Sequence, residues 1–366
     1  MSGGVDSSVT AAILKAQGHN VIGLFMKNWE EVDDCGVCTA TADFEDVRRV
    51  CERIGIPYYG VNFSKQYYDN VFEDFLSGLK RGITPNPDIL CNREIKYGYL
   101  LEKALSLGAD YLATGHYAGV EKIGDKFVLK KAKDLSKDQS YFLCALSQTQ
   151  LSRAMFPLEN LLKTEVREIA KKLGLTTAEK KDSTGICFIG EKRMREFLKN
   201  YIGGKPGDIK TADGKIVGKH EGLAFYTLGQ RRGLNIGGVS ENTSRWFVVK
   251  KDLDNNVLVV SNGECEEMFR DSLTCAEFNW VDESAKSLAI PNDAKKLTNA
   301  EGLGGATEFN ITAKTRYRQP DQAARFEILE NGDLKVFFAE KQRAITAGQW
   351  CVLYNGEKVI GGGIIL

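Results

Sequence analysis

Residues 1–18, MSGGVDSSVTAAILKAQG, place two glycines, three serines and an aspartate ahead of a helical pattern. The apolar positions that follow recur at helical spacing up to Gly18, and residues 20–26 (NVIGLFM) are typical of a buried strand. A glycine turn, a helix and a strand in this order are typical of phosphate binding. The commoner interpretation of such a stretch is a serine-capped helix start without a ligand.

The loop backbone can bind an anion. Residues 2–8 can direct successive N–H groups to one point, glycines permit close approach, and the helix adds its positive end. No G-K-[ST] follows, so this is not a P-loop. SGGVDSS instead resembles the SGGxDS signature of PP-loop ATP pyrophosphatases. That resemblance implies cleavage of ATP to AMP and pyrophosphate, with Mg²⁺ held largely by the phosphates and water.

Length and charge exclude few classes of function. At 366 residues the chain should hold two or three domains, and its 49 Lys and Arg balance 49 Asp and Glu. Residues 163–222 carry 14 Lys and Arg against 9 Asp and Glu, which indicates either a solvated helical face or contacts to phosphates. The sequence contains no apolar run long enough for a membrane span and no signal peptide, so we expect a cytoplasmic protein without membrane contact.

The nine cysteines form no dense disulfide framework, and their odd number suits a reducing compartment. Cys35 and Cys38 form a C-x-x-C pair, but the sequence has no second such pair and only three histidines. We therefore predict no protein-bound structural metal. The cysteines stand at positions 35, 38, 51, 91, 144, 187, 265, 275 and 351.

The first half of the chain alternates between helix and strand patterns. Helices are predicted over 43–54, 66–79 and 93–106, and strands over 58–63 and 111–114. This alternation predicts an α/β fold with a doubly wound parallel sheet. Because ligands bind beyond the carboxyl ends of such strands, the segments MSGGVDSS, FMKNW and ATGHY should converge.

Helical patterns largely disappear beyond about residue 195. A hairpin turn is predicted at Asp213–Gly214, residues 289–305 look like a loop insertion, and the β-rich runs from Arg245 onward predict a small antiparallel β-barrel. We expect three domains, over 1–195, 196–265 and 266–366, with the β-barrel as the last of them. The β-rich runs are 246–252, 256–260, 309–318, 324–330, 334–340 and 350–354.

Two cysteines lie in informative loops. In residues 84–98 (TPNPDILCNREIKYG), Cys91 stands near the predicted start of a helix that Asn92 can cap, a position that lowers a thiol pKa and exposes the thiol. The alternative for Cys91 is a small buried residue. Cys187, in DSTGICFIG, follows two lysines and a predicted turn, and exposure and burial are equally compatible with this stretch.

Six motifs occur in the order found in tRNA-specific 2-thiouridylases: SGGVDSS, NPDILCNREIKYG, ATGHYA, KDQSYFL, STGICFIG and TLGQRRGLNIGG. The resemblance spans essentially the whole chain. It implies that Cys91 is the catalytic thiol, that Cys187 carries a persulfide and that Asp88 handles a proton. The nucleotide contacts that it implies are Ser2, Gly3, Gly4, Val5, Asp6, Ser7, Ser8, Met26 and Gly115.

The same resemblance implies tRNA contacts around the target base and along the barrel. Each has a structural alternative, such as a hydrogen bond from His116 to its own strand end, a helix cap in residues 137–139, or ordinary barrel surface. The residues concerned are Asn86, Pro87, Asp88, His116, Lys137, Asp138, Gln139, Arg316, Tyr317 and Gln349.

The implied reaction transfers sulfur to C2 of the wobble uridine of tRNA, with ATP and Mg²⁺ as cofactors. Adenylation of the C2 oxygen creates a leaving group, and a persulfide donor or relay protein supplies the sulfur. The expected partners are tRNAs for Lys, Glu and Gln, and the chain is expected to act as a monomer. Members of the family carry a short apolar strand before the loop, so we also expect that this sequence has a truncated start.

Three other interpretations remain at this point. A PP-loop ligase or synthetase acting on a small metabolite would need neither thiol. A non-catalytic tRNA-binding protein could retain a degenerate nucleotide fold. A further variant of the thiolation mechanism places an iron–sulfur cluster on Asp88, Cys91 and Cys187.

Overall fold

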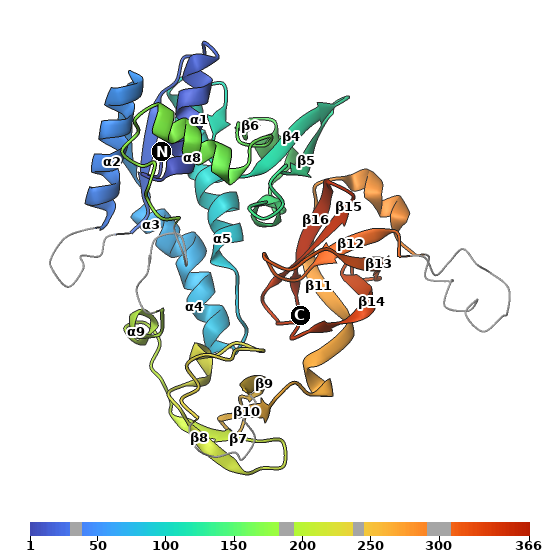
Figure 1. Ribbon diagram of the computed structural model, residues 1–366. Helices are drawn as coiled ribbons and strands as arrows, with labels where there is room; N and C mark the ends of the chain where they lie inside the picture. The colour runs from blue at the N-terminus through green and yellow to red at the C-terminus, as the bar shows by residue number, and fades with distance from the viewer. Residues whose placement is uncertain (30–38, 183–193, 237–244, 291–308) are drawn as a thin grey trace.

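The computed structural model describes residues 1–29, 39–182, 194–236, 245–290 and 309–366 (Figure 1). An α/β region, a small central sheet and a barrel follow one another along the chain. Cys35, Cys38, Cys187 and most of the predicted insertion at 289–305 lie outside the described residues. None of the helices in the described part combines the length and apolar character that crossing a membrane requires.

The N-terminal region is α/β with parallel strands, as predicted. Strand β1 (Gly23–Lys27) pairs in parallel with β2 (Tyr58–Asn62), and β3 (Leu112–Ala113) pairs in parallel with β6 (Ala154–Met155). The described strands of the parallel sheet thus form two separate pairs. The short strand β6 was not predicted from the sequence.

Helices surround these strands. Helix α1 (Val5–Ala16) follows the glycine loop and packs against α8 (Lys163–Lys172) and α2 (Thr39–Ile54). The predicted helices over 66–79 and 93–106 are present but longer. The first runs through α3 (Ser64–Tyr67), η1 (Tyr68–Phe72) and α4 (Glu73–Lys80). The second runs through α5 (Pro87–Leu90), the π-helical stretch η2 (Cys91–Leu100) and α6 (Leu101–Ser106). Short helical turns occur at η3 (Ser140–Leu143) and α7 (Gln148–Leu151).

The central sheet has four strands in the order β8–β7–β10–β9. Strands β7 (Gly207–Lys210) and β8 (Ile216–His220) form the antiparallel hairpin predicted around Asp213–Gly214, and Gly214 has a φ of 88°. Strands β9 (Trp246–Asp252) and β10 (Val257–Asn262) complete this sheet. The β-rich runs 246–252 and 256–260 therefore belong to this sheet and not to the barrel, because β10 pairs with β7. Helix α9 (Met194–Lys199) precedes the sheet, and η4 (Leu223–Phe225) follows β8.

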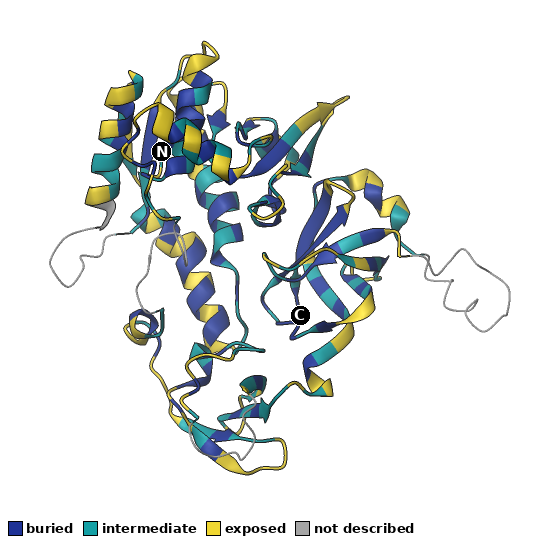
Figure 2. Ribbon diagram, in the orientation of Figure 1, coloured by how far each residue is buried: buried dark blue, intermediate teal, exposed yellow. Residues whose placement is uncertain are grey.

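The C-terminal strands form a closed antiparallel barrel, as predicted. Six strands pair in the order β11–β14–β13–β12–β15–β16, and β16 pairs back to β11. Buried residues line the inward sides of these strands (Figure 2). The strands are β11 (Phe269–Trp280), β12 (Ile311–Lys314), β13 (Gln322–Ile328), β14 (Leu334–Arg343), β15 (Trp350–Asn355) and β16 (Lys358–Ile365); η5 (Glu266–Met268) and η6 (Glu283–Leu288) flank β11.

A hairpin from the N-terminal region extends the barrel sheet. Strands β4 (Ala118–Ile123) and β5 (Lys126–Lys131) form this hairpin, and β5 pairs with β16 at Lys130 and Lys358. The buried Lys131 forms an ion pair with Asp321 of the barrel, and one apolar cluster contains residues of both regions, including Tyr141 and Trp350. The barrel and the N-terminal region therefore share a core, which holds the residues between them in place.

Candidate active site

The glycine loop leads directly into helix α1. Gly4 is the N-cap residue, and no side chain caps the helix. Gly3 has a φ of 73°, and a Cβ atom there would lie 2.8 Å from the Asp43 carbonyl oxygen. The Ser2 and Ser7 hydroxyls lie 3.1 Å apart at the surface of the loop. A helix start without a side-chain cap leaves its first amides available to an anion.

The predicted hydroxyl ligands differ in their surroundings. Ser8 is completely buried, and its hydroxyl donates to the Gly4 carbonyl oxygen at 2.8 Å and accepts from Thr177 at 3.1 Å. The Ser8 side chain therefore holds the loop in shape, whereas Ser7 and Ser2 remain at its surface.

Gly115 packs against the same loop. A Cβ atom on Gly115 would lie 2.7 Å from both the Asp6 carbonyl carbon and the Ser7 nitrogen. Met26 is partly buried near the carboxyl end of β1, and Gly115 follows β3. The predicted convergence of the loop with the ATGHY segment is confirmed by this close approach at Gly115.

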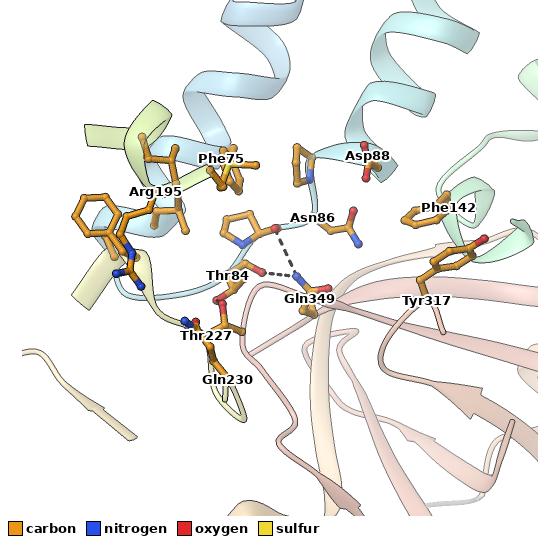
Figure 3. Close-up of a pocket in the computed structure, with 17 residues that line it drawn as sticks. Phe75, Thr84, Asn86, Asp88, Phe142, Arg195, Thr227, Gln230, Tyr317 and Gln349 are labelled. Atoms are coloured by element: carbon orange, nitrogen blue, oxygen red, sulfur yellow. Dashed lines mark hydrogen bonds between the residues drawn. The ribbon is translucent and has the colours of Figure 1, made fainter. Parts of the chain in front are cut away.

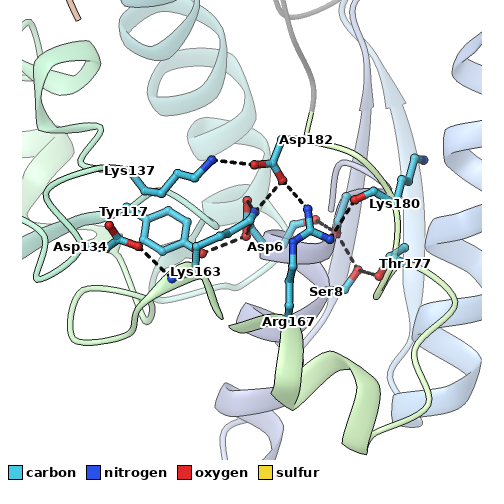
Figure 4. A network of polar contacts seen from close by, with 12 residues as sticks. Asp6, Ser8, Tyr117, Asp134, Lys137, Lys163, Arg167, Thr177, Lys180 and Asp182 are labelled. Atoms are coloured by element: carbon cyan, nitrogen blue, oxygen red, sulfur yellow. Dashed lines mark hydrogen bonds and ion pairs between the residues drawn. The ribbon is translucent and has the colours of Figure 1, made fainter. Parts of the chain in front are cut away.

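A network of charged side chains adjoins the loop (Figure 4). The nearly buried Lys163 ammonium lies 2.6 Å and 2.8 Å from the two carboxylate oxygens of Asp6 and 2.9 Å from Asp182. Asp182 also pairs with Lys137 at 2.8 Å and with Arg167 at 2.9 Å. Burial would raise the pKa of Asp182, but hydrogen bonds from Lys137 and Lys163 outweigh it and lower the pKa to about 2.

Replacing Lys163 should destabilise the N-terminal region. Lys163→Met leaves the Asp6 and Asp182 carboxylates without their shared cation, so we expect a loss of about 1–2 kcal/mol, or about 2–6 °C in the melting temperature. Differential scanning calorimetry measures this shift. Lys171→Met on the same helix is the control, because the Lys171 ammonium is exposed and lies 3.7 Å from Glu179. Equal melting temperatures for the two variants would contradict the structural importance of Lys163.

Residues 84–86 (TPN), which we call the proline loop, lead into a helix, and Cys91 lies near the start of that helix, as predicted. The helix begins at Pro87 with Asn86 as its N-cap residue, and Asp88 stands in its first turn. Cys91 is only 1% exposed and packs in an apolar cluster that includes Ile95, Phe197 and Leu198. The prediction of an exposed thiol was therefore wrong for this conformation, because Cys91 belongs to a buried apolar cluster whose members come from distant parts of the sequence.

Cys51, Cys144, Cys265, Cys275 and Cys351 are free thiols. Burial raises the pKa of the Cys51 and Cys144 thiols, which therefore stay protonated. The predicted pairing of Cys91 with Cys187 stays a prediction, since Cys187 lies outside the described residues. Within the described ranges, no group of three or more His, Cys, Asp or Glu side chains is arranged to hold a metal ion.

A pocket of about 550 Å³ lies where the three regions meet (Figure 3). The predicted contacts Asn86, Pro87, Asp88, Tyr317 and Gln349 all line it. The Gln349 amide donates to the Thr84 carbonyl oxygen at 2.8 Å and so joins the barrel to the proline loop. One wall of the pocket is apolar, with Phe75, Leu79 and Leu198 among its residues.

Phe142, Arg195, Thr227 and Gln230 are among the lining residues of this pocket that sequence reasoning missed. The Phe142 ring lies 4.4 Å from the Tyr317 ring between centroids, and the Phe142 carbonyl oxygen accepts from Asn92 at 2.9 Å. Phe142 lies in the motif KDQSYFL, and Thr227 and Gln230 lie in TLGQRRGLNIGG. Arg195 lies in the basic stretch of residues 163–222. These positions were the only signals in the sequence for the four residues.

The remaining predicted tRNA contacts do not line this pocket, and several have partners within the protein. The Asp138 carboxylate is buried and accepts from the Ala132 and Ser140 backbone and the Ser140 hydroxyl. Gln139 accepts from the Tyr117 backbone at 3.0 Å. Asp138 and Gln139 therefore bind neighbouring segments of the protein, and no side chain caps η3, so the helix cap offered as the alternative is absent there. RNA contact by these side chains stays a prediction.

His116 and Arg316 are similarly engaged. The His116 Nδ1 atom lies 2.8 Å from the Thr114 hydroxyl at its own strand end, and burial, aided by Lys96, lowers the His116 pKa well below its usual value. The Arg316 guanidinium donates to the Leu228 and Ala344 carbonyl oxygens. Arg316 therefore connects the barrel to the central region in this conformation.

Much of the positive charge in residues 163–222 pairs within the protein. Besides Lys163 and Arg167, Lys180 pairs with Asp43 and Asp46, and Lys199 pairs with Glu221. The charge excess of this stretch is therefore weak evidence for phosphate contacts.

The glycine loop, its α/β region and the two β domains define a PP-loop nucleotide-binding protein with an appended central sheet and barrel. Three family models match in succession: the tRNA methyl transferase HUP domain over residues 1–191, the tRNA methyl transferase PRC-barrel domain over 195–262 and the Aminomethyltransferase beta-barrel domain over 270–365. The chain belongs to the tRNA-specific 2-thiouridylase family, as its motifs predicted.

Curated relatives match over the whole chain. The tRNA-specific 2-thiouridylase MnmA of Listeria monocytogenes is 54% identical over 366 residues, covering 100% of this chain and 93% of the relative. That of Lysinibacillus sphaericus is 53% identical, covering 100% and 92%.

Two solved structures show only a weak likeness. The NMN synthetase of Francisella tularensis has a TM-score of 0.32 and 16% identity, over 55% of this chain and 70% of that one. The U34-tRNA thiolase NcsA of Methanococcus maripaludis, with its 4Fe-4S cluster, has a TM-score of 0.34 and 20% identity, over 56% and 65%.

Proposed function

We propose that this protein uses ATP to replace the C2 oxygen of the wobble uridine (U34) of tRNA with sulfur. The main support is the pocket of about 550 Å³, which all three regions line and which holds Asp88 from the helix that carries Cys91. A uracil base extruded from an anticodon loop needs a pocket of this kind. The names of the relatives that match over the full chain support tRNA as the substrate.

ATP is proposed to bind at the glycine loop. The α1 start without a side-chain cap and the close approaches at Gly3 and Gly115 fit a phosphate chain that lies against the backbone. Mg²⁺ would neutralise the departing pyrophosphate, and Asp6 is the loop carboxylate available to it. The loop amides orient the phosphates, and Lys163 keeps Asp6 in position.

Activation precedes sulfur transfer in this proposal. The uracil O2 atom attacks the α-phosphorus of ATP, so a P–O bond forms, pyrophosphate leaves, and the proton at N3 is lost. Asp88 in the pocket wall can accept that proton. The adenylated oxygen is then a good leaving group, whereas a free carbonyl oxygen is not.

Sulfur arrives as a persulfide on Cys187, loaded by a separate sulfur donor or relay protein. The terminal sulfur attacks C2, and AMP leaves with the original oxygen. The Cys91 thiolate then attacks the Cys187 sulfur and breaks the S–S bond, which leaves 2-thiouridine and a disulfide between the two cysteines. An external dithiol returns both cysteines to thiols. Because Cys91 is buried in an apolar cluster, this step requires the cluster to open around the thiol.

The proposal is tested by incubating the protein with ATP, Mg²⁺, a persulfide sulfur donor and unmodified tRNA for Lys, Glu or Gln. We expect 2-thiouridine by mass spectrometry and pyrophosphate release only when tRNA is present. Release of pyrophosphate without RNA would instead indicate a ligase for a small metabolite. Tight tRNA binding without release would indicate a non-catalytic binding protein.

The mechanism also has a separate test. Iron content of protein purified without air distinguishes the persulfide route from an iron–sulfur cluster on Asp88, Cys91 and Cys187. We expect activity that does not depend on iron.

We also expect the protein to act as a monomer in the cytoplasm, with domains over 1–195, 196–265 and 266–366.

A further inference from the structure

A second hollow, of about 360 Å³, lies on the central region. We call it the arginine–tryptophan hollow. Among the described residues, its lining contains three arginines, one tryptophan and no acidic residue, although the chain as a whole has a formal net charge of zero. Its lining residues are Arg231, Arg232, Gly233, Leu234, Asn235, Ile236, Arg245 and Trp246.

The sheet brings these residues together. The Gly229 nitrogen donates to the Val248 carbonyl oxygen at 2.8 Å, and the Val248 nitrogen donates to the Gln230 carbonyl oxygen at 3.0 Å. The chain segment after Gln230 therefore lies beside the start of β9, which carries Trp246 and follows Arg245. Arg231 and Arg232, which are adjacent in the sequence, therefore line the same hollow as Arg245.

Internal contacts hold this turn in shape. Gly229 and Gly233 both have a φ of 74°, and the Gln230 amide donates to the Arg232 carbonyl oxygen at 2.9 Å. Arg195 of α9 donates to the Gly233 carbonyl oxygen at 3.0 Å. The backbone between the two hollows is thus fixed by contacts on both sides, while the side chains of Arg231, Arg232 and Arg245 remain exposed.

Neighbouring residues of the chain line the hollow and the pocket at the junction of the three regions. Thr227 and Gln230 line that pocket, and Arg231, the next residue, lines the hollow. A nucleotide adjacent to one whose base enters the pocket would therefore lie within reach of the hollow. Arginines bind phosphates through paired N–H groups, and a partly exposed tryptophan offers a face on which an unpaired base can stack.

We propose that the arginine–tryptophan hollow binds the single-stranded nucleotides next to the target base, with the arginines on their phosphates and Trp246 stacked on a base. The identity of this RNA as an anticodon loop rests on the proposed function. The phosphate contacts expected from residues 163–222 would then come chiefly from Arg231, Arg232 and Arg245, whose side chains are exposed.

The test measures binding of a fluorescein-labelled anticodon stem-loop RNA by anisotropy, without ATP or sulfide, between about 50 and 200 mM salt. Replacing Arg231, Arg232 and Arg245 together with Ala should weaken binding at least about tenfold and make the slope of log affinity against log salt shallower by about 2. The three matching Arg→Lys changes should keep most of that slope.

The control variant removes three positive charges from other parts of the protein surface. Lys15, Lys126 and Arg270 are exposed on three other elements, and replacing all three with Ala should leave the salt slope almost unchanged. An arginine variant whose slope equals that of the control would overturn the proposal. If that variant also lost sulfur transfer from a donor protein, the hollow would be a site for an acidic protein and RNA binding there would be wrong.

Trp246 has its own readout. With 2-aminopurine at the nucleotide next to the wobble position, wild-type protein and Trp246→Phe should quench the fluorescence, and Trp246→Leu should not. Trp246→Leu should also weaken binding about tenfold, with a circular dichroism melt to check its folding. Equal quenching by the Leu and Phe variants would refute stacking. Wild-type protein that bound RNA through these residues but formed no 2-thiouridine would retain this inference and overturn the proposed function.

Discussion

Cys91→Ser and Cys187→Ser should each abolish formation of 2-thiouridine, by about a thousandfold or more, while tRNA-dependent pyrophosphate release persists. Adenylation uses the O2 atom of uracil and the phosphates of ATP, so it needs neither sulfur. Sulfur transfer needs both, since one cysteine carries the persulfide and the other breaks it. Quantitative mass spectrometry of the tRNA and a coupled pyrophosphate assay measure the two steps separately.

The controls address folding and the general loss of a thiol. Cys275 is completely buried in the barrel, so Cys275→Ala should keep thiolation near the wild-type rate. Cys91 is buried among apolar side chains, and Cys91→Ala checks that the serine hydroxyl has not disturbed them. Loss of pyrophosphate release in both the Cys91 and Cys187 variants would argue against these roles and for a structural role of the thiols.

Gly115→Ala should abolish ATP-dependent chemistry almost completely. The added Cβ atom would lie 2.7 Å from the Ser7 nitrogen and the Asp6 carbonyl carbon, so the backbone of the loop has to move. Because that backbone is proposed to orient the phosphates, a small displacement should lower pyrophosphate release by about a hundredfold. Isothermal titration with a non-hydrolysable ATP analogue should show the matching loss of affinity.

Gly203→Ala provides the matched control for this change. A Cβ atom on Gly203 meets nothing within 4 Å, so the same substitution there should leave ATP binding and pyrophosphate release unchanged. If Gly115→Ala bound the analogue as tightly as Gly203→Ala, the glycine loop would not be the nucleotide site. Melting curves of both variants separate a local displacement from general unfolding.

Local patterns predicted much of the N-terminal region. The glycine turn and helix α1 depend on neighbouring residues, and so do the helix after the proline loop and the Asp213–Gly214 hairpin. Each was predicted because turn residues and apolar periodicity act over a few positions. The motifs SGGVDSS and NPDILCNREIKYG also indicated the family, because the order of the motifs and the spacing of their residues are read directly from the sequence.

Pairing between distant strands could not be predicted in the same way. Runs 246–252 and 256–260 have the β-branched composition of the later barrel strands, yet they pair within the central sheet. The hairpin of β4 and β5 gave no sign that it would join β16. Composition favours a strand, but the partner is chosen by packing across the whole molecule.

The sequence by itself determined the nucleotide loop, the family and the identity of several pocket residues, because these depend on residue types at short spacing. Only the tertiary structure decided that Cys91 is buried in one cluster with Phe197, that Phe142 lies against Tyr317, and that Arg231 and Arg245 line the same hollow. These residues stand from 14 to 175 positions apart, and no local pattern encodes such a contact. Burial and side-chain neighbours arise when the three regions pack together, so the chemistry of each group depends on the folded molecule.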